Sequence, residues 1–354
     1  MYKRIHLSGA LVLALAACEQ NPVRALPAQA GPVLLEATTG AAPVYGGSEN
    51  DYQPSLIRAA DGRLMIVLER LAPRTNSGDL YVSTSSNGGA SWSTPALIVG
   101  TRGNERHPSL VQHPSGSFSL FYLLVDKKGA YHIHRATSTN GTTWTQRGAV
   151  NLGWTTAGNM NPSVIIEADG SLTMTYQRYT GTEYVGYIAR STDGGATWDS
   201  LRTTITDGTQ GMLPRVAKRA SDGLYMVTFQ ATGPGGTLEI YARTSTDPYS
   251  WSGPRTTVSM VADSHDSQPI VLEDGRFLVT YIGLGTDSGY NLYYRTTDGS
   301  AWAAPVKLTT DAAQSDVEPH PILHGTPGHV VLSWGRQSPA GHYDIWVNPD
   351  LAIQ

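Results

Sequence analysis

The side chains best suited to chemistry recur at regular intervals along this 354-residue chain. Six prolines, each opening an apolar run, stand 54, 54, 52, 55 and 52 residues apart: Pro54, Pro108, Pro162, Pro214, Pro269 and Pro321. The residues just before them are Gln53, His107, Asn161, Leu213, Gln268 and His320. Five of these six side chains are polar and can form hydrogen bonds, and only Leu213 is apolar. If the fold brings the six segments to one axis, they form a ligand site there.

Acidic residues lie in the same segments or at the ends of the runs that follow. These are Glu69, Glu105, Asp266 and Glu318. A pair of carboxyl groups can supply the general acid and the base or nucleophile of glycoside cleavage, so these four are candidate catalytic residues. The same segments add candidate substrate-binding residues: Arg70, Arg106, Arg178, Arg215, His265, Trp334 and Arg336.

The elements that must position these residues are short strands. In the third copy, residues 161–166 and 171–176 flank the turn Asp169-Gly170, and the runs 184–190 and 201–205 follow. Four antiparallel strands in about fifty residues cannot bury their apolar faces alone, so neighbouring copies must stack. The sequence therefore predicts an all-β fold, a six-bladed β-propeller of four-stranded antiparallel blades, over residues 32–354.

The hairpin between the third and fourth strands carries the most specific motif. Ser191-x-Asp193-x-Gly195-x-Thr197-Trp198 has weaker copies at residues 85–92, 138–144, 245–251 and 296–302. An Asp or Asn can accept hydrogen bonds from its own turn, Gly supplies a positive φ, and Trp packs beneath the hairpin, so the motif predicts a structural role. It resembles the Asp-box, or BNR repeat, of the sialidase (neuraminidase) superfamily.

The resemblance implies an active site at the channel mouth opposite the Asp-boxes, with a nucleophilic Tyr and a partner Glu. Tyr281 and Glu69 are the candidates favoured by location. It also implies an Arg-Ile-Pro start to the first inner strand, whereas this chain has Tyr52-Gln53-Pro54. A neutral Gln supplies neither the charge nor the fork of an Arg that clamps a carboxylate, so the expected substrate is a glycan, with sialic acid disfavoured.

The sixth copy lacks an Asp-box and a fourth strand. The strand-like run at residues 33–39 is expected to fill that place and close the ring. Its removal should then lower the stability of the whole domain.

The first residues resemble a bacterial lipoprotein signal peptide. Lys3 and Arg4 precede the apolar residues 7–17, and Leu15-Ala16-Ala17-Cys18 resembles the box at which the Cys becomes the acylated N-terminus. We therefore expect a signal peptide at residues 1–17, lipidation at Cys18, a flexible tether at residues 18–31, and export to the cell envelope. The lipid would be the only membrane contact.

Composition and the absence of certain motifs reduce the number of functions that remain possible. A formal net charge of -4 and 15% charged residues give no basic field for nucleic acid. No nucleotide-binding fingerprint or local metal-binding motif occurs, so we expect no cofactor and no metal. We expect the protein to be a monomer. Two alternatives to a glycoside hydrolase stay open: a uronate polysaccharide lyase using His or Tyr as base, and a non-catalytic glycan-binding or assembly propeller.

Overall fold

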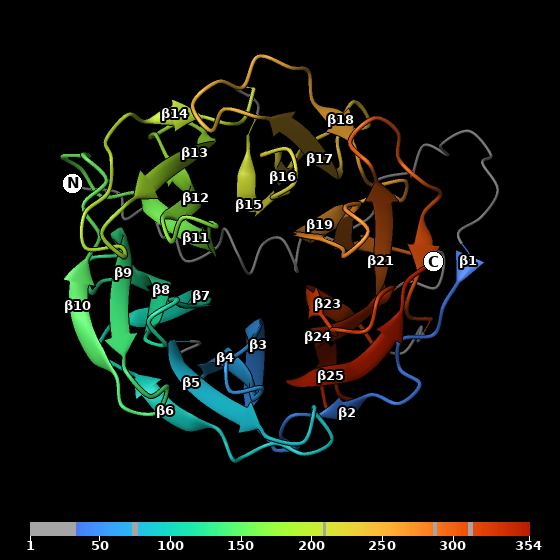
Figure 1. The fold of residues 1–354 in the computed structure, drawn as a ribbon. Coiled ribbons are helices and arrows are strands. Elements are labelled where there is room, and N and C mark those ends of the chain that lie inside the picture. The colour runs from blue at the N-terminus through green and yellow to red at the C-terminus, as the bar shows by residue number, and fades with distance from the viewer. Residues whose placement is uncertain (1–32, 73–76, 208–209, 286–288, 311–313) are drawn as a thin grey trace, which may run out of the picture.

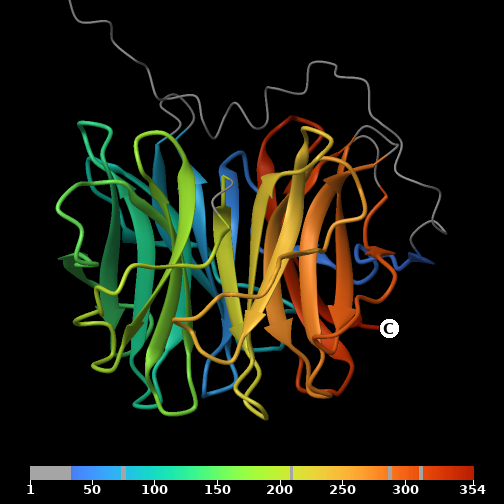
Figure 2. The same cartoon turned by 90° about the horizontal axis from the view of Figure 1, so that it is seen from above.

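The computed structural model describes residues 33–72, 77–207, 210–285, 289–310 and 314–354. Cys18, the expected signal peptide and the tether lie outside these residues. Six sheets are arranged around a central axis (Figure 1), and their strands run between two opposite rims (Figure 2). This confirms the predicted six-bladed propeller. Within the described part of the chain, no helix has the length and apolar character needed to cross a membrane.

Each of the first three blades is one antiparallel sheet in chain order, from the axis outward. Blade 1 comprises β3 (Asn50–Arg58), β4 (Leu64–Leu71), β5 (Gly78–Ser85) and β6 (Ala96–Val99). Blade 2 comprises β7 (Asn104–Gln112), β8 (Phe118–Val125), β9 (Tyr131–Ser138) and β10 (Thr145–Ala149). Blade 3 comprises β11 (Asn159–Ile166), β12 (Leu172–Tyr179), β13 (Tyr184–Ser191) and β14 (Thr203–Thr204).

The other three blades follow the same plan, with the N-terminal segment contributing to the last two. Blade 4 comprises β15 (Met212–Lys218), β16 (Tyr225–Thr232), β17 (Leu238–Ser245) and β18 (Thr256–Thr257). Blade 5 comprises β19 (Ser264–Val271), β20 (Phe277–Leu284), β21 (Tyr290–Thr297), β22 (Val306–Lys307) and the added β1 (Val33–Leu34). Blade 6 comprises β23 (Asp316–Leu323), β24 (His329–Gln337), β25 (Tyr343–Ala352) and β2 (Ala42–Pro43).

The N-terminal segment closes the ring, but not with the residues that the sequence suggested. The prediction that residues 33–39 fill the last blade is wrong, because β1 pairs in parallel with β22 of blade 5. A turn after Glu36, with Gly40 at a φ of 78°, carries the chain across to blade 6. There β2 pairs antiparallel with β25 and supplies the outer strand. The segment therefore joins blades 5 and 6.

The hydrophobic core lies between the blades. Each of the six junctions has its own cluster of buried apolar side chains, such as Phe121 and Met174 between blades 2 and 3. Strand pairing within a blade leaves both of its faces to be covered by its neighbours, so the ring is stabilised as a whole.

The Asp-box hairpin of blade 3 has a structural role. Asp193 accepts hydrogen bonds from Ser191 Oγ (2.8 Å) and Thr197 N (2.9 Å). The Trp198 ring meets Phe121 of blade 2 edge-on at 5.5 Å. The hairpin thus closes its own turn and packs against the preceding blade. We call the rim that carries these hairpins the Asp-box rim.

Candidate active site

A ring of left-handed residues surrounds the channel at the end opposite the Asp-box rim. Each inner strand has a β-bulge, and the first bulged residue has a φ between 48° and 56°. This conformation is uncommon for residues other than Gly, yet all six blades adopt it. The members of this bulge ring are Gln53, His107, Asn161, Leu213, Asp266 and Glu318.

The bulge ring corrects the proline frame read from the sequence. In blades 1 to 4 the ring residue directly precedes the repeated Pro. In blades 5 and 6 it stands three residues before Pro269 and Pro321. Gln268 and His320 therefore match Ser55 of blade 1. Each stands two residues after the bulge position, where the inner strand pairs regularly with the next strand again. The ring positions of these blades are occupied by acids.

A cavity of about 900 Å³ begins at the bulge ring and follows the inner strands toward the Asp-box rim. Seven of the residues expected at the site contribute to its wall. They are Gln53, His107, Arg215, Asp266, Gln268, Glu318 and His320.

Asp266 and Glu318 are neighbouring carboxyl groups on this wall. Burial raises the pKa of Glu318 to about 8, and the negative charges of Asp266 and Glu69 add to the shift. Burial also raises the pKa of Asp266, against the opposing positive charges of His265 and Arg215. Because two neighbouring carboxylates repel each other, the pair retains a proton at neutral pH.

The two carboxyl groups have different partners. Glu318 Oε2 accepts a hydrogen bond from Gln53 N at 2.5 Å. The carboxylate of Asp266 accepts none from the described residues, although its own backbone N–H donates to Gln230 Oε1. An ionisable group that is partly open to a cavity and has no fixed partner is a candidate for contact with substrate.

Arg215 supplies the positive charge at this end of the cavity. Its Nη1 donates to Asn161 O at 3.3 Å. Burial lowers the pKa of Arg215, and the negative charges of Asp266 and Glu318 oppose that shift. A guanidinium stays protonated in such surroundings, so Arg215 places a fixed cation beside the carboxyl pair.

His107 and His320 on the cavity wall are neutral at neutral pH. Burial, followed by the charge of Arg215, lowers the pKa of His320 to about 4. Burial, followed by the charges of Arg106 and Arg215, lowers the pKa of His107 well below its ordinary value. Each also bonds to another blade: His320 Nδ1 accepts from Leu56 N (3.4 Å), and His107 N donates to Gln53 Oε1 (3.0 Å). Neither adds charge to the cavity.

Several expected site residues are instead buried in the framework. Glu69 is fully buried and pairs with Arg106 at 2.7 Å. Glu105 is fully buried and accepts a hydrogen bond from Thr101. Tyr281 lies in the core, stacked on Tyr293.

The remaining expected residues also have local partners. Arg70 makes a two-pronged ion pair with Asp51, at 2.7 and 2.8 Å. Arg178 donates to Asn159 and Thr156, His265 pairs with Asp263, and Asn161 donates to Gln177. Trp334 is buried with its Nε1 on Asp316, and Arg336 lies 3.6 Å from the same carboxylate.

Sequence reasoning did not recognise a second ring of residues, which stand two positions after the bulge ring on each inner strand. Ser55, Ser109 and Ser163 line the cavity beside Arg215 and Gln268. Ser55 Oγ accepts from Leu110 N and Ser109 Oγ from Val164 N, both at 2.9 Å, so they also join neighbouring blades. The available signal was their spacing, two residues after each bulge position.

Comparison with known proteins agrees with the fold described above. The sequence model of the BNR repeat-like domain matches residues 53–213. It covers blades 1 to 3 and the start of blade 4. No curated protein sequence matches the chain.

Solved structures of other proteins share the fold of this chain at low sequence identity. A Dyadobacter fermentans protein of unknown function has a TM-score of 0.72 and 17% identity, covering 89% of this chain and 98% of its own. The NanB sialidase of Streptococcus pneumoniae has a TM-score of 0.69 and 13% identity, covering 89% and 71%. An α-L-arabinanase of Penicillium chrysogenum has a TM-score of 0.67 and 13% identity, covering 87% and 97%.

Proposed function

We propose that this protein is a glycoside hydrolase whose reaction takes place at the polar end of the channel. The observation that carries the proposal is the pair of neighbouring carboxyl groups of Asp266 and Glu318 on a cavity wall that also includes Arg215. Glycoside cleavage uses two carboxyl groups, one protonated and one ionised. Environments that separate the pKa values of neighbouring acids produce that state at neutral pH.

The two acids have distinct roles in the proposed reaction. Glu318, protonated below its pKa of about 8, donates its proton to the glycosidic oxygen as the bond to the anomeric carbon breaks. Water adds to that carbon, and Asp266 takes up the proton that the water releases. The products are a free sugar and the leaving alcohol, and proton exchange with solvent restores both acids. Arg215 and the cavity amides would bind sugar hydroxyls.

The similar structures named as a sialidase and an arabinanase support carbohydrate as the substrate class. Within the proposal, a neutral sugar fits better than sialic acid. Arg70 is engaged by Asp51 and Arg106 by Glu69, so neither is free to clamp a substrate carboxylate. Among the described residues, Arg215 is the guanidinium whose charge acts on both acids of the pair, and the ionised acid balances it.

The test is turnover of 4-nitrophenyl glycosides and natural polysaccharides by the wild type, Glu318→Gln and Asp266→Asn. We expect each variant to fold and to lose at least about a hundredfold in kcat/KM. Glu273→Gln, an exposed acid on the Asp-box rim, is the control and should keep full activity. Full activity in both site variants would refute the assignment. A product absorbing as an unsaturated uronate would indicate a lyase, and binding without turnover a non-catalytic propeller.

We also propose that the chain is exported and anchored by a lipid on Cys18. The support is the sequence of residues 1–18. Mass spectrometry of the mature N-terminus should find an acylated Cys18, and Cys18→Ser should release the protein from the membrane fraction. An unmodified N-terminus at Met1 would contradict this.

A further inference from the structure

Beyond its polar end, the channel wall becomes apolar. Two residues after the ring that contains Ser55 and Arg215, every inner strand places an aliphatic side chain on the cavity. We call these residues the apolar collar: Ile57, Val111, Ile165, Ala217, Ile270 and Ile322.

The collar is incompletely covered by the protein. Val111 and Ala217 are buried, whereas the four isoleucines are only half-buried. Each isoleucine packs on one side against a junction between blades. Its other side lines the cavity. Four partly exposed isoleucines around one axis leave apolar surface in contact with water, which favours the binding of an apolar group between them.

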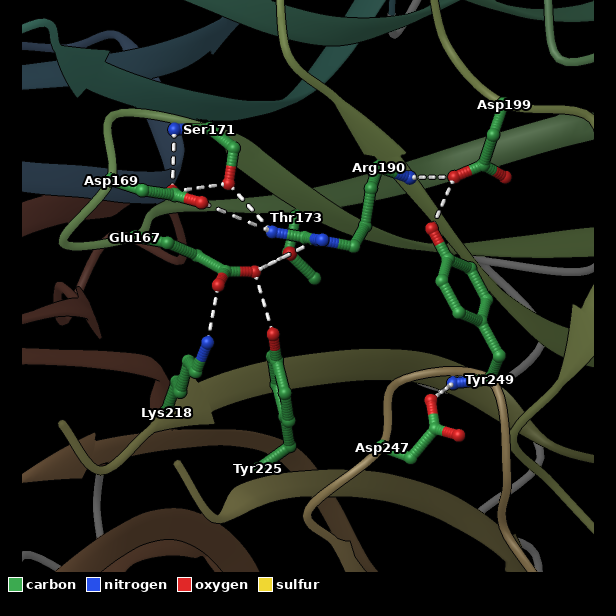
Figure 3. A network of polar contacts seen from close by, with 10 residues as sticks. All are labelled: Glu167, Asp169, Ser171, Thr173, Arg190, Asp199, Lys218, Tyr225, Asp247 and Tyr249. Carbon is green, nitrogen blue, oxygen red and sulfur yellow. Dashed lines mark hydrogen bonds and ion pairs between the residues drawn. The ribbon is translucent and has the colours of Figure 1, made fainter. Parts of the chain in front are cut away.

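The channel remains open on the far side of the collar. There the wall is completed by short, exposed side chains at the inner turns, Ala60, Pro114, Ala168 and Ala220. Lys218 near this end donates to Glu167, which also accepts from Arg190 and Tyr225 (Figure 3), so these charges balance within the network. Arg58 is exposed and donates to His324 O. The collar itself offers no hydrogen-bonding side chain, so a sugar unit there would leave its hydroxyl groups unsatisfied.

We infer that the apolar collar binds the apolar aglycone of a glycoside whose scissile bond lies at Asp266 and Glu318. This rests on the proposed function and specifies its substrate class. The cavity is continuous from the carboxyl pair to the collar. A sugar held by the polar end would therefore direct its leaving group toward the Asp-box rim. An aromatic or terpenoid alcohol matches the wall that it would contact, and a second sugar does not.

The test compares 4-nitrophenyl and methyl glycosides of whichever panel sugar is cleaved best, in the wild type, Ile165→Ser and Ile270→Ser. Each variant should lose about tenfold in kcat/KM on the aryl glycoside, mostly through KM, and less than about twofold on the methyl glycoside. Leu201→Ser, which alters a side chain that is 64% exposed, should leave kcat/KM unchanged on both glycosides. Equal losses on both glycosides would overturn the inference while leaving the hydrolase intact.

A binding readout separates this inference from the proposed function. Titration with 1-anilinonaphthalene-8-sulfonate should show one site per chain in the wild type and in Glu318→Gln, weakened at least fivefold in Ile165→Ser. If no glycoside is cleaved, the proposed function fails and the aglycone assignment fails with it. If turnover is seen but the dye binds Ile165→Ser as tightly as the wild type, only the collar assignment is overturned.

Discussion

The backbone N–H of Gln53 in blade 1 donates a hydrogen bond of 2.5 Å to the carboxyl group of Glu318 in blade 6. The two residues are 265 positions apart and meet where the ring closes. Gln53 can direct its N–H toward blade 6 because the bulge holds it at a φ of 51°. The contact that joins the two ends of the propeller thus also orients the proposed acid.

The first prediction concerns the pH dependence caused by Glu318. Burial, with the charges of Asp266 and Glu69, raises its pKa from the ordinary 4.5 to about 8. Between these values the folded protein binds a proton that the unfolded chain has lost, so the free energy of unfolding falls as pH rises through this range. Glu318→Gln cannot ionise. It should be more stable than the wild type at pH 9, with the advantage shrinking toward pH 5, in denaturant titrations.

The pH dependence of activity also reports on the protonation of Glu318. If Glu318 is the general acid, kcat/KM of the wild type should fall as pH rises through about 8, because the donor loses its proton. A stability difference between wild type and Glu318→Gln that is constant from pH 5 to 9 would contradict the raised pKa. If kcat/KM fell through about pH 8 while the stability difference stayed constant, the ionising group that causes the loss of activity would not be Glu318.

The second prediction concerns Arg215, whose charge acts on several cavity groups. It lowers the pKa of His320, after burial, and opposes the raised pKa of Asp266. In Arg215→Met the pKa of His320 should rise above about 4, by about one unit, and remain below 6.5 because burial persists. Nuclear magnetic resonance titration of the imidazoles measures this directly.

Two controls accompany the Arg215 experiment. Arg215→Lys retains a charge and should give a smaller shift. His134, whose pKa is lowered by burial and by His132, should titrate unchanged. A His320 pKa that is the same in all three proteins would show that the charge of Arg215 does not act on His320. In Arg215→Met the acidic limb of kcat/KM should also move upward, as Asp266 becomes harder to ionise.

The sequence predicted the blades because each carries redundant local signals: a strand-turn-strand run, a turn motif and a Trp. It misaligned blades 5 and 6 with the other blades, because Pro269 and Pro321 resemble Pro54 locally while strand pairing aligns Ser267 and Pro319 with it. The candidate acids differ in how deeply they are buried and in their partners. Glu69 and Asp266 look alike in sequence, but Arg106 neutralises only the first. Such partners lie in other blades, so a period along the chain cannot reveal them.

The third prediction concerns the closing segment. Asn348 of blade 6 is buried, and its Nδ2 donates to Ala37 O (2.8 Å) and Thr39 O (3.1 Å). Asn348→Ala leaves both carbonyls without this donor and should cost about 1–3 kcal/mol of unfolding free energy. Asn151→Ala, at an exposed loop, is the matched control and should cost less than about 1 kcal/mol. Equal midpoints for Asn348→Ala and the wild type would show that the segment is dispensable for closure.

The fourth prediction separates Glu167 from its neighbour Asp169 in the network of Figure 3. The Glu167 side chain is 2% exposed and joins Arg190 of blade 3 to Lys218 and Tyr225 of blade 4, whereas Asp169 is 67% exposed. Glu167→Gln removes the counter-charge of two cations and should cost about 3–5 kcal/mol. Asp169→Asn should cost no more than about 1 kcal/mol, because water screens an exposed pair.

The pH dependence of the Glu167 pair has the opposite sign to that of Glu318. Burial favours the neutral acid, but hydrogen bonds from Lys218, Thr173 and Tyr225 outweigh it and lower the pKa of Glu167 below 4.5. Its contribution is therefore complete above pH 4.5 and is lost as pH falls through the lowered pKa. The gap between wild type and Glu167→Gln should narrow in acid, while the gap for Glu318→Gln widens in base. The free energy of unfolding of the wild type minus that of the variant should thus fall toward acid for Glu167→Gln and toward base for Glu318→Gln. If both differences fell toward the same end of the pH range, one of the two carboxyl groups would have been assigned the wrong protonation state.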